Sequence, residues 1–219
     1  MGAWQGLNLG THVGDRADHV AENRARLQAA LGVRPVFLAQ VHGTDVLPLD
    51  PGTPDGAVAD ACITDQAGVA CTIMVADCLP VLFADVSGAR VAGAHAGWRG
   101  LAAGVLERTV QAFESPARTM AWLGPCIGPS AFEVGDEVRA VFIAASASAA
   151  ERFRPTGAPG KWWADLPGLA RDRLASAGVL QIHGNDGSAP WCTVSNPLQF
   201  FSHRRDGVSG RFAACIWRD

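Results

Sequence analysis

Several features that would assign this chain to a function class at once are absent. No apolar stretch reaches bilayer-spanning length, and residues 1–6 lack the basic and apolar regions of a signal peptide. Positive charge is not in excess either: the net charge is −3, so we expect no basic surface for nucleic acid or an anionic membrane. The sequence therefore predicts a cytoplasmic protein without nucleic-acid or membrane partners, and leaves its oligomeric state open.

Cysteine pairs of the C-x-x-C type are also missing, although the chain has six cysteines. At 219 residues the chain is too long for a small disulfide scaffold. Most of the cysteines lie in apolar runs, as Cys71 and Cys215 do, so we expect buried free thiols. Reduced thiols are typical of the cytosol, which agrees with the missing signal peptide.

The composition supports a sizeable core, because 48% of the residues are hydrophobic and 18% are charged. Apolar spacing predicts helices at 15–31 and 166–177, with Gly32 ending the first and Asp165 capping the second. Strands are predicted at 35–41, 68–76, 81–84, 90–94, 120–123 and 179–182, a hairpin partner of the first strand at 46–49, and a terminal hairpin from 200–204 and 211–217. Many strands joined by short turns favour an α+β fold with a mixed sheet, in one domain over residues 1–219.

Two histidines and one cysteine stand where predicted strands end. His42, Cys78 and His95 each follow an apolar run, and the ends of neighbouring strands converge in space. Zinc prefers histidine nitrogen and cysteine thiolate, and a catalytic zinc site uses three protein ligands and keeps one position for water. No H-E-x-x-H or H-x-H motif supports this set locally. From spacing alone, histidines that are merely hydrogen-bonded at strand ends remain the alternative.

Six short motifs are spread along nearly the whole chain. They are L-N-L-G-T-H-V-G-D at 7–15, Q-V-H-G at 40–43, A-D-C-L-P at 76–80, H-A-G-W-R-G at 95–100, G-P-C-I-G-P at 124–129 and F-F-S-H-R-R-D at 200–206. Together they resemble the YfiH-like family, which carries the labels laccase-like polyphenol oxidase, purine nucleoside phosphorylase and peptidoglycan editing factor. The resemblance implies a layered α/β/β/α sandwich with mixed sheets, and one zinc ion held by His42, Cys78 and His95.

The resemblance also implies an enzyme that acts on purine nucleosides with phosphate. The expected reaction is phosphorolysis of adenosine, inosine or methylthioadenosine to the base and a ribose 1-phosphate, and adenosine deamination is expected as well. Candidate cations for phosphate are Arg99, Arg204 and Arg205, because a guanidinium matches phosphate bidentately. The alternative for each is a solvated or paired surface charge.

Three further residues are candidates for the site. Asp77 could orient a histidine ligand, or could instead bond to backbone amides of its loop. Cys126 could face the pocket, although a structural role is the simpler interpretation. His203 stands where the family usually has tyrosine, and it could be a neutral substitution or could add a titrating group near the site. Family members usually begin with an extra strand and a T-R-x-G-G-V-S segment, so we expect this chain to lack both.

Three other functions remain open. A copper-dependent polyphenol oxidase would need clustered H-x-H pairs, which the chain lacks, although a single site with two nitrogens and one sulfur could take copper. In a cysteine hydrolase that edits peptidoglycan precursors, Cys78 would be the nucleophile and His95 the base. A non-enzymatic protein that binds metal or nucleoside is the third.

We expect Cys78→Ser to lose both zinc and activity, because a hydroxyl is a far poorer zinc ligand than a thiolate. Metal content and adenosine turnover of the purified variant would be measured in parallel. A variant that keeps its full zinc content would show that Cys78 is not a ligand.

Overall fold

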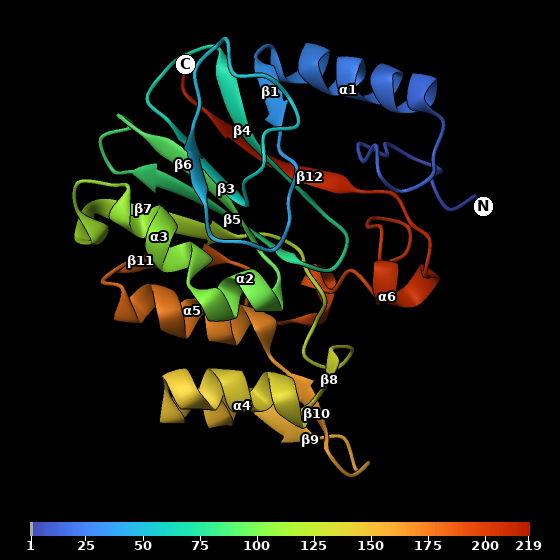
Figure 1. Cartoon of the computed structure of the whole chain (residues 1–219), viewed down its shortest axis with the longest axis vertical. Helices are drawn as coiled ribbons and strands as arrows, with labels where there is room; N and C mark the ends of the chain where they lie inside the picture. The colour runs from blue at the N-terminus through green and yellow to red at the C-terminus, as the bar shows by residue number, and fades with distance from the viewer. Residues whose placement is uncertain (1) are drawn as a thin grey trace.

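The computed structural model describes residues 2–219, and its first helix forms where the apolar spacing predicts it. Helix α1 (Ala17–Leu31) ends at Gly32, whose left-handed backbone (φ 72°) lets its N–H donate to the Gln28 carbonyl. The helix lies along the outer face of a sheet, at one side of the molecule (Figure 1). An apolar cluster lies between the helix and this sheet, and it consists of Leu9, Leu27, Phe37, Met74 and Ala213.

The sheet beneath α1 has three strands, and its middle strand is buried throughout. Strand β4 (Val69–Val75) runs parallel to β1 (Arg34–Phe37) and antiparallel to β12 (Phe212–Trp217). Both faces of β4 are covered, by α1 on one side and by a second sheet on the other. This double burial explains why the segment reads as a continuous apolar run instead of an alternating one.

The second sheet has six strands in the order β11-β7-β5-β6-β3-β2 and mixes parallel with antiparallel pairs. Its strands are β2 (Val46–Pro48), β3 (Ala61–Thr64), β5 (Leu79–Asp85), β6 (Val91–Ala96), β7 (Thr119–Leu123) and β11 (Gln181–Gly184). The two sheets approach closely at Gly93 of β6, where a Cβ would lie 2.8 Å from Cγ1 of Ile73 in β4. The face of β6 that carries Gly93 therefore looks into the space between the sheets.

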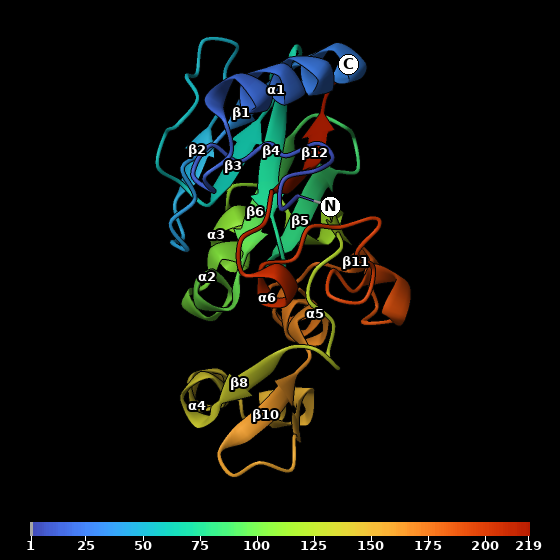
Figure 2. The same cartoon turned by 90° about the vertical axis from the view of Figure 1, so that its right-hand side faces the viewer.

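Helices cover the far face of the six-stranded sheet and enclose the main core (Figures 1 and 2). They are α2 (Trp98–Ala103), α3 (Val105–Gln111) and α5 (Leu166–Ser176). Gly104 separates α2 from α3 with a left-handed backbone (φ 100°). The Asp165 side chain caps α5 by accepting from the Gly168 amide, as the sequence predicts.

A smaller unit of strands and one helix packs at one end of the molecule (Figure 2). It consists of β8 (Glu133–Gly135), α4 (Asp136–Ala145), β9 (Phe153–Pro155) and β10 (Lys161–Ala164). Short 3-10 helices connect other segments, at Pro116–Arg118, Ala147–Arg152 and Ala189–Trp191. None of the helices in residues 2–219 has the length and apolar character needed to cross a membrane.

The predicted α+β class and the layered α/β/β/α arrangement are confirmed, but two predicted hairpins are wrong. Strand β2 pairs in parallel with β3 and not with β1. Residues 200–204 form no strand, because Ser202 accepts a hydrogen bond from the Arg205 amide and starts the short helix α6 (His203–Asp206). The capping side chain therefore determines the local structure in place of the two apolar residues before it.

Candidate metal centre

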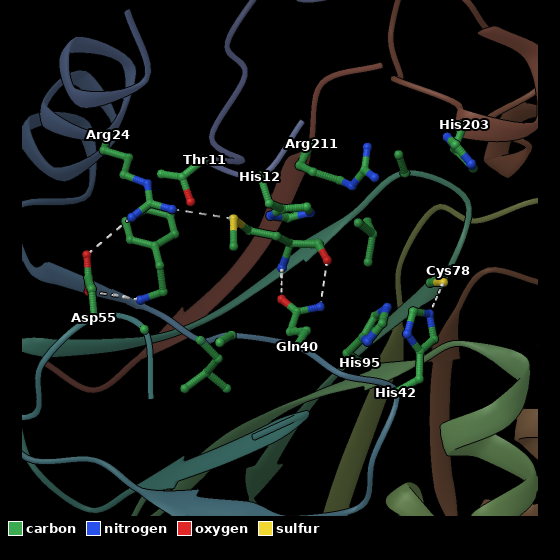
Figure 3. Close-up of a pocket in the computed structure, with 17 residues that line it drawn as sticks. Thr11, His12, Arg24, Gln40, His42, Asp55, Cys78, His95, His203 and Arg211 are labelled. Atoms are coloured by element: carbon green, nitrogen blue, oxygen red, sulfur yellow. Dashed lines mark hydrogen bonds and ion pairs between the residues drawn. The ribbon is translucent and has the colours of Figure 1, made fainter. Parts of the chain in front are cut away.

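Three ligand-type side chains from separate segments meet at one edge of the space between the sheets (Figure 3). His42 lies in the connection between β1 and β2, Cys78 directly precedes β5, and His95 is in β6. Their ligand atoms all lie within 4.8 Å of one another. Nε2 of His42 is 3.7 Å from Sγ of Cys78, and the two imidazole rings are 4.8 Å apart.

The backbone is strained beside two of these side chains. His42 has a φ of 62°, and Asp77, next to Cys78, has a φ of 90°. Residues other than glycine rarely adopt this left-handed region, so surrounding contacts must hold them there. In residues 2–219 they are the two non-glycine positions with positive φ, and both belong to the cluster's own segments.

Asp60 supplies the contacts that hold this geometry. Its side chain is fully buried, and Oδ1 lies 2.7 Å from Nδ1 of His95. Oδ1 also accepts from the His42 amide at 2.9 Å, while Oδ2 accepts from the amides of Val41 (2.9 Å) and Gly43 (2.7 Å). With Nδ1 of His95 bonded to the carboxylate, Nε2 is left to face Cys78 and His42.

Sequence reasoning missed Asp60, although a signal was present. It is the one charged residue in the apolar run at 57–63, and an ionised carboxylate in such a run requires buried partners. The pKa of Asp60 is lowered: burial favours the neutral acid, but the hydrogen bonds from His95 and from the amides of Gly43 and Val41 outweigh burial.

Charge interactions make the cysteine a thiolate at neutral pH. Burial alone raises the pKa of Cys78, but the positive charge of His95 and hydrogen bonds from both histidines lower it to about 6. Burial likewise disfavours protonated His95, but the Cys78 thiolate and the hydrogen bond to Asp60 raise its pKa to about 9. Without a metal, the two therefore form a thiolate–imidazolium pair.

The donor set and its spacing fit a zinc ion. In a tetrahedral site with bonds of about 2.3 Å to sulfur and about 2.0 Å to nitrogen, sulfur and nitrogen are roughly 3.5 Å apart. The 3.7 Å between Cys78 Sγ and His42 Nε2 matches this separation. In the part of the chain that the structure describes, these three residues are the one group of three or more potential ligands. Such a set would leave one coordination position for another molecule.

Gly97 leaves room for the cluster where any side chain would intrude. A Cβ at this position would lie 2.7 Å from Cδ2 of His42 and 2.9 Å from Sγ of Cys78. Gly100, one turn later in α2, packs against the backbone of the His42 loop. A Cβ at this position would be 3.1 Å from the Gly43 carbonyl oxygen. Two glycines of the H-A-G-W-R-G motif thus allow α2 to approach the His42 loop.

A cavity of about 700 Å³ opens beside the cluster, and His42, Cys78 and His95 form part of its wall. Its volume lies within the range of about 300–1,000 Å³ that is usual for small-molecule sites. The apolar part of the wall comes from Phe37, Leu38, Ala39, Val75 and Ala76, and the polar part includes Thr11, His12, Arg24, Gln40, Asp55, His203 and Arg211. His203, predicted from the sequence, therefore faces this cavity (Figure 3).

The Asp77 carboxylate contacts neither histidine of the cluster. Oδ1 accepts from the Thr193 hydroxyl at 2.5 Å, and Oδ2 accepts from the Arg204 amide at 2.6 Å. The suggestion that Asp77 orients a histidine ligand is therefore corrected: Asp60 occupies that position. Asp77 instead joins the Cys78 segment to two segments near the C-terminus.

Cys126 is fully buried and is not among the described residues that line the cavity. Its thiol accepts from the Asn185 side chain at 3.4 Å. Burial, together with the nearby charge of Cys78, raises the pKa of this thiol well above its ordinary value. The pocket-facing position considered for Cys126 is therefore not the one it takes.

The three arginines predicted to bind phosphate also lie outside the wall of this cavity as the described residues form it. The exposed Arg99 extends its guanidinium over the Trp98 ring, 4.4 Å from its centroid. Arg204 donates to the Glu133 carbonyl, and Arg205 donates to the carbonyls of Thr193, Val194 and Phe200. Arginines that do line the cavity are Arg24 and Arg211, and neither was a sequence candidate.

Comparison with known proteins gives consistent similarities over the full length. Residues 1–219 match a family model described as multi-copper polyphenol oxidoreductase laccase. Purine nucleoside phosphorylase YfiH of Escherichia coli is 52% identical over 217 residues, which cover 98% of this chain and 87% of that protein. A Pseudomonas aeruginosa protein that bears the name purine nucleoside phosphorylase is 52% identical over 212 residues, 96% of this chain and 85% of its own length.

Solved structures show the same similarity. Protein NMB0706 of Neisseria meningitidis, of the DUF152 family, superposes with a TM-score of 0.92 at 47% identity, covering 100% of this chain and 89% of that one. YlmD from Geobacillus stearothermophilus gives a TM-score of 0.90 at 33% identity and covers 100% and 87%.

Asp60→Asn should weaken zinc binding by roughly tenfold to a hundredfold, the usual effect of losing a carboxylate behind a histidine ligand. Asparagine keeps the shape but carries no charge, and its NH₂ group cannot accept the loop amides. Zinc affinity would be measured by chelator competition, with Asp186→Asn, an exposed aspartate far along the chain, as control. Unchanged affinity in Asp60→Asn would contradict the role of this carboxylate.

Gly97→Ala should displace His42 and Cys78, because the added methyl group overlaps both side chains. We expect the zinc affinity to fall by roughly tenfold or more. Gly2→Ala is the matched control, since a Cβ there meets nothing within 4 Å. Both variants would be compared by metal content and thermal unfolding, and a fully loaded Gly97→Ala protein would refute the close packing described above.

Proposed function

From the premise that this chain belongs to the YfiH family, whose model bears the laccase description, we propose that it is a zinc-dependent purine nucleoside phosphorylase. The main support for this proposal is the convergence of His42, Cys78 and His95 at a cavity large enough for a nucleoside. Relatives at 52% identity bear the name purine nucleoside phosphorylase, which supports the choice of substrate. The six free thiols fit the reducing cytoplasm that the sequence predicts.

Phosphorolysis requires two reactants to meet at the ribose C1′ atom. A phosphate oxygen forms a bond to C1′ while the bond from C1′ to the purine nitrogen breaks, and the electron pair leaves with the base, which takes up a proton. A zinc ion held by the three donors would supply Lewis acidity at its open position. Adenosine, inosine and methylthioadenosine are the proposed nucleosides.

The residues around the centre support this chemistry by orientation and exclusion of water. Asp60 keeps the Nδ1 side of His95 occupied, so that Nε2 points toward the centre. The apolar part of the wall includes Phe37, Leu38 and Val75, which are themselves almost fully buried, and the Arg24 guanidinium lies over the Phe37 ring. His203 stands at the same cavity and can donate or accept a hydrogen bond there.

We also propose adenosine deamination at this centre, in which a water oxygen replaces the amino group at C6 and ammonia leaves. Polar attack on a purine ring is established chemistry for zinc sites. The roles considered for Arg99, Arg204 and Arg205 in binding substrate stay predictions, and nothing in their contacts adds support.

The ligand count argues against a multi-copper oxidase. Multi-copper oxidases need several neighbouring groups of histidines, and residues 2–219 contain one group of three potential ligands. A site with two nitrogens and one sulfur can still bind copper, which is favoured over zinc at most such sites. Oxidation of phenols would then accompany copper loading.

One observation favours a second candidate, a cysteine hydrolase. The Cys78 thiolate lies beside the His95 ring, and the other side of that ring bonds to the buried Asp60 carboxylate. This is the arrangement of an activated nucleophile. Such an enzyme would act on an amide or ester, as in the editing of peptidoglycan precursors. Stoichiometric zinc would argue against it, since a zinc-bound thiolate is a poor nucleophile.

We expect the zinc-loaded protein to release adenine and ribose 1-phosphate from adenosine only when phosphate is present. Products would be separated by chromatography with and without phosphate, and inosine formed in both conditions would reveal the deaminase activity. Protein stripped by a chelator serves as control: activity should disappear and return with one equivalent of zinc. Undiminished turnover by metal-free protein, or no adenine with phosphate, would overturn the proposal.

A further inference from the structure

An arginine that no sequence motif suggested reaches into the cavity beside the metal cluster. Arg211 stands directly before β12, and Figure 3 shows its side chain extending over the cavity between His12 and the cluster. Arg24 and Asp55 lie at the opposite end of the same view. Arg211 is thus the arginine of the cavity wall nearer to the reacting centre.

The guanidinium of Arg211 keeps donors free. Nη1 donates to the carbonyls of Ser209 (2.9 Å) and Gly210 (3.0 Å), whereas Nε and Nη2 make no hydrogen bond to any residue in 2–219. It has no carboxylate within 4.0 Å in that range either. Arg24, by contrast, is already paired with Asp55 and bonded to the Leu9 carbonyl.

The L-N-L-G-T-H motif holds this arginine in place. The side chain of Asn8, fully buried, accepts from the backbone amides of Arg211 (2.9 Å) and Gly10 (3.0 Å). The Leu9 amide donates to the Arg211 carbonyl at 3.0 Å. Gly10 leaves space for the arginine stem, since a Cβ there would lie 2.8 Å from Cγ of Arg211. The same motif then supplies Thr11 and His12 to the cavity wall.

We propose that Arg211, together with His12, forms the subsite for the phosphate that attacks the nucleoside. This inference rests on the proposed phosphorylase function. Two free N–H groups of a guanidinium match two oxygens of a phosphate, and the His12 imidazole, which lies beside Arg211 in Figure 3, can donate to a third. The position between the polar end of the cavity and the cluster would bring the phosphate to the centre where the glycosidic bond breaks.

The groups around Arg211 carry charges of both signs. Partial burial lowers the pKa of Arg211, while the negative charges of Cys78 and Asp77 raise it, which indicates that these groups share one field. Partial burial also lowers the pKa of His12, and the positive charges of Arg211 and Arg24 lower it further. An anion bound among them would relieve this mutual repulsion of positive groups.

The test uses zinc-loaded protein and inorganic phosphate as the probe. In Arg211→Gln, the dissociation constant for phosphate and the KM for phosphate should rise by roughly tenfold to a hundredfold, the usual cost of a lost charged hydrogen bond. Zinc content and the KM for adenosine should stay near the parent values. Arg211→Lys keeps the positive charge but loses the two parallel N–H donors of the guanidinium. Its dissociation constant and KM for phosphate should lie between those of the parent and those of Arg211→Gln. Arg108→Gln, an exposed arginine on α3, is the control for loss of one positive charge.

The outcomes separate this inference from the proposed function. Phosphorolysis with an unchanged phosphate KM in Arg211→Gln would overturn the subsite and leave the function standing. A different result would be a parent protein that binds phosphate more tightly than Arg211→Gln does and yet catalyses no phosphorolysis. That result would support the anion site and overturn the proposed function. A parent protein that shows no heat of phosphate binding in calorimetry, or a variant in which adenosine affinity falls as much as phosphate affinity, would also overturn the subsite.

Gly10→Ala gives an independent measurement of the same subsite. The added methyl group would displace the Arg211 stem without touching a metal ligand. We expect weaker phosphate binding with full zinc content, and unchanged phosphate binding would contradict the positioning role of the motif.

Discussion

The centre depends on one buried carboxylate that bonds to two different parts of the chain. Asp60 accepts from three consecutive backbone amides of the loop that carries His42, and from the ring of His95 in β6. Removing it would leave the buried His95 ring nitrogen without its partner, at a cost of about 1–3 kcal/mol, and would free three amides of the half-buried loop. The same contacts hold His42 at a positive φ, so the strain of that loop and the orientation of the second ligand have a common origin.

The sheet explains why this carboxylate lies where it does. Asp60 directly precedes β3, which pairs antiparallel with β6, and the backbone ladder continues past the strand because the His95 amide donates to the Asp60 carbonyl at 2.7 Å. Pairing thus puts Asp60 beside His95 by register alone. Cys78 comes from the opposite neighbour of β6, since it directly precedes β5. Three adjacent strands of one sheet therefore determine two ligands and their support.

The three candidate metal ligands could be predicted from the sequence because their residue types suit a metal and they stand at the ends of predicted strands. His42, Cys78 and His95 follow apolar runs, and their motifs are specific. The sequence was insufficient where the answer depends on which strands pair or where a side chain points. Asp77 and Asp60 are both acids near the ligands, and only register separates the one that bonds to His95 from the one that bonds to Thr193. The same limit hid Arg211, which meets the L-N-L-G segment only through the fold.

The charge balance of the centre relates the metal to the anion. The Cys78 thiolate and the Asp60 carboxylate together offset a divalent cation, while the two histidines contribute as neutral ligands. A bound cation would offset the charge of Cys78, one of the two negative groups that act on Arg211. The other, Asp77, already accepts from the Thr193 hydroxyl and the Arg204 amide, so the positive charge of Arg211 beside the cavity would be less balanced than before. In the partly buried space this charge is weakly screened and attracts an anion more strongly than it would in water. Metal binding and anion binding should therefore be coupled, with each favouring the other.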